Sequence, residues 1–159
     1  KGSLYEGGIR VPMIAWWPGR VAPGSVTDHL AAHYDVPATL AEIASAEPPP
    51  DTDGISFLPE ILGNSNAQKK HDYLFWDFPG YGGQIAARMG KWKGIKTNLQ
   101  KNRDAPLELY NLEEDISESN NVAEEYPEIA ARIQQVMYDA RSVPRFEKFR
   151  FGRYEPPQA

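Results

Sequence analysis

The sequence predicts an α+β chain with two parts: a remnant of a larger α/β sheet, and a small four-stranded antiparallel sheet packed by one helix. Three observations carry this prediction. The apolar run over residues 11–17 is typical of a central parallel strand, covered on both faces. Four later segments have the composition or the spacing of strands. Residues 127–141 have the apolar spacing of one amphipathic helix.

The first part is expected over residues 1–63. A strand over 9–17 opens it, with Pro12 at the strand start or on a bulge, because proline cannot donate to a β-ladder. A helix over 35–44 follows, with Asp35 as its N-cap and Pro37 in its first turn. Ser56 is a candidate cap for a short helix ending near residue 62, where Gly63 suits the C-terminal stop.

The second part is expected over residues 64–141, after a polar connection at 64–70. Its four predicted strands are spaced for an antiparallel sheet, with Gly90 in the tight turn between the second and third. Pro127 and Glu128 suit the first turn of the final helix, whose apolar face should lie on the sheet. Residues 142–159 form a tail without a regular pattern. The predicted strands are 73–78, 84–89, 92–97 and 107–111.

The composition excludes several kinds of site and of partner. The 159 residues are enough for roughly one domain with a real core. The chain has no cysteine, which excludes disulfides, thiolate nucleophiles and cysteine metal sites. A net charge of −5 argues against broad nucleic-acid affinity. No apolar run approaches the roughly 18 residues that span a bilayer, so we expect neither nucleic acid nor membrane as a partner.

Lys1 is the candidate catalytic residue, because it stands on a short loop that leads into the predicted buried strand. The loop end of such a strand is where open α/β sheets keep their chemistry. Gly7 and Gly8 permit either backbone angles closed to other residues or the close approach of another group. We expect Glu6 and Arg10 to hold the loop through charge-assisted hydrogen bonds.

The three histidines do not predict a metal site. His29 and His33 are four residues apart, but no third ligand lies nearby in the sequence. His33 precedes a helix and is a candidate substrate-binding residue, although a polar residue at a helix entry is the commoner case. In the tail, basic residues alternate with aromatic ones, which suits either anionic-polymer binding or aromatic anchoring to the domain.

Three motifs resemble the sulfatase family, of the alkaline-phosphatase-like superfamily. Residues 1–19 read K-G-x-x-Y-E-G-G-I-R-V-P…W-P-G, which resembles the start of the C-terminal third of these enzymes. The segment D-G-x-S-x-x-P follows at 53–59, and A-x-R-M-G-K-W-K…E-L-Y-N-L-E-x-D at 86–115 resembles the C-terminal subdomain. The resemblance extends to about Arg141. It implies a sulfuric ester hydrolase, arylsulfatase-like, in which Lys1 contacts the sulfate group of the substrate.

The resemblance also implies parts that this sequence does not contain. A preceding segment would carry calcium ligands and a formylglycine made from Cys or Ser in a C/S-x-P-S-R motif. The 159-residue chain alone is therefore expected to be inactive, with the rest of its parent as partner, or a second copy bound through Val11 to Trp17. The expected substrate is a sulfated small molecule or glycan, and the expected location is periplasmic or secreted.

Two alternatives stay open at this point. One is a phosphoester or phosphonate hydrolase of the same superfamily, which the missing nucleophile motif would distinguish. The other is a non-catalytic structural or glycan-binding module, whose contact surface would be the loop at 78–84 together with the aromatic tail.

Overall fold

The computed structural model describes residues 2–155. Their contacts group them into two compact units. One unit combines the chain up to Val11 with the chain from Asp72 onward, and the other is Pro12–His71. The division expected at 1–63, 64–141 and 142–159 stays a prediction about domains. No helix among the described residues is long and apolar enough to cross a lipid bilayer.

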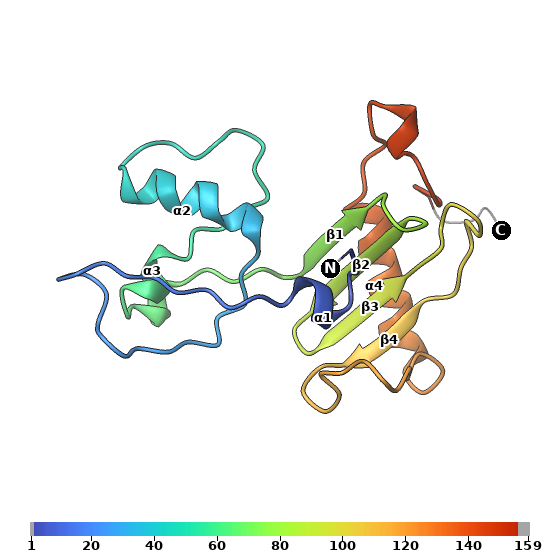
Figure 1. The fold of residues 1–159 in the computed structure, drawn as a ribbon, viewed down its shortest axis with the longest axis horizontal. Coiled ribbons are helices and arrows are strands. Elements are labelled where there is room, and N and C mark those ends of the chain that lie inside the picture. The colour runs from blue at the N-terminus through green and yellow to red at the C-terminus, as the bar shows by residue number, and fades with distance from the viewer. Residues whose placement is uncertain (1, 156–159) are drawn as a thin grey trace. The chain divides into compact units, whose positions relative to one another are not determined.

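The first unit is built on a four-stranded antiparallel sheet in which each strand pairs with the next along the chain. This confirms the predicted sheet. Gly90 has a φ of 57° and forms the predicted tight turn between the second and third strands, a conformation that glycine adopts without strain. The strands are β1 Leu74–Phe78, β2 Gln84–Met89, β3 Trp92–Lys96 and β4 Glu108–Asn111 (Figure 1).

Helix α4, Pro127–Asp139, covers one face of the sheet, as predicted (Figure 1). Ile133 and Met137 are buried on its apolar side. Gly94 on β3 lets the helix come close, because a Cβ built there would lie 2.5 Å from Cγ2 of Ile133. The core on this side of the sheet also includes Ile85, Ala87, Leu99, Leu109 and Phe151.

The N-terminal residues cover the opposite face of the sheet. Leu4 is buried against Ala86, Ile95 and Tyr110, and a single helical turn, α1 Glu6–Ile9, follows it. Figure 1 shows α1 and α4 on opposite sides of the strands. Residues at the start of the sequence therefore form the third layer of a sheet whose strands begin some 70 residues later.

The second unit, Pro12–His71, is helical and irregular. Its buried centre is Asp35, whose carboxylate accepts N–H groups of Ala32 and Ile55 at 2.7 and 2.9 Å. Nε2 of His71 lies 2.8 Å from the same carboxylate. The short helices agree with the prediction, and Ser56 accepts the N–H of Leu58 at 3.2 Å. The elements are η1 His33–Asp35, α2 Val36–Ile43, α3 Leu58–Ile61 and η2 Ser65–Ala67.

The strand predicted over 9–17 is wrong. Ile9 ends α1, and residues 10–17 form neither helix nor strand. The backbone groups of a strand need a neighbouring strand, and the unit Pro12–His71 contains none. The first predicted part therefore keeps its short helices but lacks the predicted strand. Ile14 and Trp16 of this run are instead 91% and 84% exposed.

Candidate functional site

The anchored segment, which we define as residues 2–10, follows the candidate catalytic lysine directly. Gln84, the buried first residue of β2, holds its beginning with both side-chain atoms. The side-chain N–H₂ donates to the Gly2 carbonyl at 3.3 Å, and the side-chain oxygen accepts the Leu4 N–H at 3.1 Å. The backbone immediately after Lys1 is thus tied to a rigid strand.

Gly2 is required at its position for two reasons. Its φ of 76° is unfavourable for residues with a side chain. A Cβ built there would also lie 2.4 Å from the ring of Tyr81. The chain can therefore pass beneath Tyr81 only with glycine next to Lys1.

A buried charge cluster fixes the middle of the anchored segment. Lys93 on β3 is 0% exposed, and its Nζ lies 2.8 Å from Oε1 of Glu6 and 2.9 Å from Oε1 of Glu118. Glu118 also accepts the backbone N–H of Glu6 at 2.5 Å. One ammonium group is therefore shared by two carboxylates, and it joins α1 to the sheet.

Arg10 completes the cluster at its solvent side. Its Nε donates to Oε2 of Glu6 at 2.7 Å, so the expected Glu6–Arg10 pair is present. Burial alone would raise the pKa of Glu6, but the hydrogen bond and charge of Lys93, followed by those of Arg10, outweigh it. The pKa of Glu6 is held below its ordinary value, and the carboxylate stays ionised at neutral pH.

A tyrosine pair adds a second attachment. The hydroxyl groups of Tyr5 and Tyr110 both donate to Oε2 of Glu108, at 2.5 and 2.7 Å. Burial, and next the hydrogen bond to the Glu108 carboxylate, raise the pKa of both phenols. Both therefore remain donors throughout the physiological range.

The predicted site residues are only partly placed by the structure. Lys1 lies outside the described residues, and its catalytic role stays a prediction. His33 is exposed at the start of η1, and its substrate-binding role also stays a prediction. Among residues 2–155, no group of three or more His, Cys, Asp or Glu side chains could hold a metal ion.

The anchoring residues Gln84, Lys93 and Glu118 were not found by sequence reasoning. Lys93 did leave a signal in the sequence. It lies two residues before Ile95 on the same strand, so both side chains point to the same, core-facing side of the sheet. A lysine at such a position needs a buried carboxylate partner. Glu118 has a φ of 54° in a turn and left no comparable signal.

This arrangement fixes the backbone of residues 2–10, but the described residues do not provide a complete reaction centre. The described residues lack a metal cluster, and the chain contains no C/S-x-P-S-R motif from which formylglycine could be made. The residues present therefore do not fit calcium or formylglycine. Charge stabilisation by Lys1 stays a prediction, because Lys1 lies outside the described residues.

Comparison of the sequence with known proteins identifies related families and relatives. A family model described as "N-sulphoglucosamine sulphohydrolase, C-terminal" matches residues 1–143. The chain is 32% identical over 157 residues to arylsulfatase A of Bos taurus, covering 86% of this chain and 31% of that protein. It is 28% identical to an N-acetylgalactosamine-6-O-sulfatase of Bacteroides thetaiotaomicron, and that match covers 89% of this chain and 29% of the relative.

The fold has a match among solved structures. One from Bacteroides thetaiotaomicron, described in connection with the metabolism of multiple glycosaminoglycans, superposes with a TM-score of 0.68 at 28% identity. The match covers 88% of this chain and 31% of that one. The chain thus spans about a third of the length of these proteins.

Proposed function

This chain belongs to the sulfatase family and matches the C-terminal part of such enzymes, and on that premise we propose that it serves the hydrolysis of a sulfate ester. The anchored segment is the observation that carries the proposal. It ties the backbone after Lys1 to the sheet through Gln84, and the middle of the segment through Lys93. A cation on so fixed a backbone is suited to stabilise charge at a defined point.

The proposed role of Lys1 follows from the chemistry of the bond. Hydrolysis breaks the S–O bond, water supplies the oxygen added to sulfur, and the products are an alcohol and inorganic sulfate. Negative charge increases on the leaving oxygen as this bond breaks. An ammonium at hydrogen-bond distance lowers the energy of that transition state more than that of the ground state.

The rest of the catalytic centre is proposed to lie outside these 159 residues, in a longer parent protein. The length of the relatives supports this, since the chain spans about a third of them. Calcium and formylglycine are proposed for that other part, where they would polarise the sulfate and supply the attacking oxygen. The chain's own contribution is then to position Lys1.

The substrate is proposed to be a sulfated glycan. Support comes from a relative that is named for a sulfated amino sugar and from a structural match described in glycosaminoglycan metabolism. A phosphoester or phosphonate hydrolase of the same superfamily is the competing reaction class.

The test is an assay of the purified parent protein with matched aryl sulfate and aryl phosphate esters. We expect turnover of the sulfate and at least about a hundredfold lower kcat/KM for the phosphate. The isolated 159-residue chain should turn over neither ester above a buffer control, because it lacks an activated nucleophile. A parent protein that prefers the phosphate, or an isolated chain that hydrolyses the sulfate, contradicts the proposal.

A further inference from the structure

The side chain of Lys96, at the end of β3, is largely buried, and no protein acceptor pairs with its ammonium within the described residues. It is 7% exposed, and its ammonium makes no hydrogen bond or ion pair with any residue in the described range. Burial lowers the pKa of Lys96, and the charge of Asp104 only partly offsets this effect. The ammonium of Lys96 therefore has no protein acceptor among the described residues, and an anion that enters from solvent can bind it.

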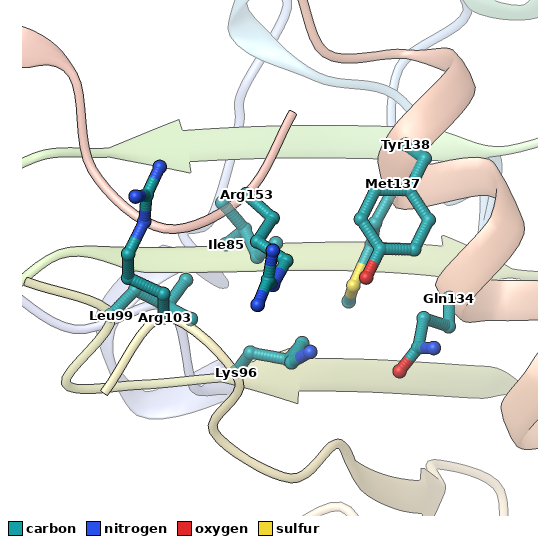
Figure 2. A pocket seen from close by; sticks show the side chains of 8 residues that line it. All are labelled: Ile85, Lys96, Leu99, Arg103, Gln134, Met137, Tyr138 and Arg153. Carbon is teal, nitrogen blue, oxygen red and sulfur yellow. The ribbon is translucent and has the colours of Figure 1, made fainter. Parts of the chain in front are cut away.

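The space beside Lys96 is lined by donors and apolar groups. Figure 2 shows Lys96 extending toward a cavity that Gln134 and Tyr138 of α4 face from the other side. The cavity measures about 10 Å³, which is room for roughly one water or one oxygen atom. Its lining contains no carboxylate. The lining residues are Ile85, Lys96, Leu99, Arg103, Gln134, Met137, Tyr138 and Arg153.

A larger hollow of about 640 Å³ shares Leu99 and Arg103 with this cavity. This hollow is open to solvent. Nε of Arg103 donates to the Gly152 carbonyl at 3.1 Å, which fixes the guanidinium between the two spaces. Its terminal nitrogens contact no carboxylate among the described residues, so they are free to bind an anion.

The tail concentrates positive charge around the larger hollow. Residues 141–154 contain five Lys or Arg and one Glu, in a chain whose net charge is −5. Arg141 and Arg153 are engaged by Asp77 and Asp104. Three other basic residues line the hollow without an ion pair within the described part of the chain, and one carboxylate, Glu147, lines it as well; the basic residues are Arg103, Lys148 and Arg150.

We propose that this double cavity binds one sulfated sugar unit, with a sulfate oxygen directed toward Lys96 and Arg103 and the sugar ring in the larger hollow. The site lies on the α4 side of the sheet, on the face opposite the anchored segment. A sulfated and a phosphorylated ligand would both present an oxyanion to these side chains. The choice of the sulfated sugar rests on the proposed function. The rings of Phe151 and Tyr154 stack on the guanidinium of Arg141. This contact holds in place the part of the C-terminal tail that lines the hollow.

The test is calorimetric titration of the 159-residue chain with a heparin-derived hexasaccharide at about 0.15 M salt. Binding is expected for the sulfated hexasaccharide and not for its chemically desulfated counterpart. Lys96→Met should weaken binding at least about tenfold, because one charge-assisted hydrogen bond contributes that much. Arg103→Gln, at an exposed position, should weaken it similarly and provides a second variant in case Lys96→Met does not fold.

Lys101→Gln is the matched control, since Lys101 is exposed on the same loop and lines neither cavity. It should change the Kd less than about twofold. The proposal is overturned if the native chain does not bind the hexasaccharide, if Arg103→Gln binds as tightly as the native chain, or if all three variants lose affinity equally. Tighter binding of a nucleoside monophosphate than of the sulfated sugar would overturn the ligand class. No turnover is measured, so a failure of the proposed hydrolysis would leave this result unchanged.

Discussion

At the residue scale, the most informative group is Lys93. An ammonium without solvent contact is costly unless it is paired, and here Glu6 and Glu118 both pair with it. The pairing joins residue 6 to residue 93 and residue 118, three positions far apart in the sequence. The fold thereby converts one core-facing lysine into the attachment point of the segment that follows Lys1.

The charge cluster predicts an acid-sensitive contribution to stability. The pKa of Glu6 is lower in the folded chain than its ordinary value near 4.5. Its stabilisation is therefore fully present above about pH 4.5 and is lost as pH falls through the lower, folded-state pKa. Glu6→Gln should lower the free energy of unfolding at pH 7 by about 3–5 kcal/mol, the usual cost of breaking a buried pair.

Urea titrations at pH 7 and pH 3.5 measure this effect. The difference between native protein and Glu6→Gln should shrink at the lower pH. Glu113→Gln, at an exposed residue of a turn, is the control and should stay within about 0.5 kcal/mol at both pH values. An equal Glu6→Gln deficit at both pH values would mean that the ionised carboxylate is not what stabilises the fold.

At the element scale, the sheet unit could be predicted from sequence and the segment before it could not. Aromatic content and spacing located β1 to β4, and the 3.6-residue period located α4. The run at 11–17 has the composition of a strand, but pairing is a property of two segments, and no strand lies within its unit to pair with it. Local sequence patterns also cannot predict long-range ion pairs such as that of Lys93 with Glu118.

The contact between α4 and β3 gives a second prediction. Gly94→Val should lower the free energy of unfolding by about 1–3 kcal/mol. A Cβ at this position would lie 2.5 Å from Cγ2 of Ile133, which is too close without a shift of the helix. Chemical denaturation monitored by circular dichroism measures the loss. Ala131→Val, on the exposed side of α4, should cost less than about 1 kcal/mol. A Gly94→Val chain as stable as the native one would mean that the helix does not pack this closely.

At the scale of the whole molecule, the chain combines a well-packed three-layer unit with an exposed apolar run. Met13, Ile14 and Trp16 are 58%, 91% and 84% exposed. Neighbouring exposed apolar side chains of this size are typical of contact surfaces. They are consistent with a surface that the rest of a parent protein, or a second copy, would cover.

We therefore expect the isolated chain to self-associate through residues 11–17. Sedimentation velocity at micromolar concentrations should show species larger than 17.8 kDa. The double variant Ile14→Ser with Trp16→Ser should shift the distribution toward monomer, because the apolar surface that drives association is removed. A native chain that stays monomeric throughout, or a double variant that associates equally, would contradict this prediction.

The kinetics of Lys1→Ala in the parent protein are the sharpest test of the proposed role of Lys1, which is to stabilise the charge that develops as the sulfate ester is cleaved. We predict that kcat for an aryl sulfate falls by roughly two to three orders of magnitude while KM changes much less, since the lost interaction strengthens in the transition state. Lys101→Ala, an exposed lysine on another loop, should keep native kinetics. A Lys1→Ala enzyme with near-native kcat would contradict the account.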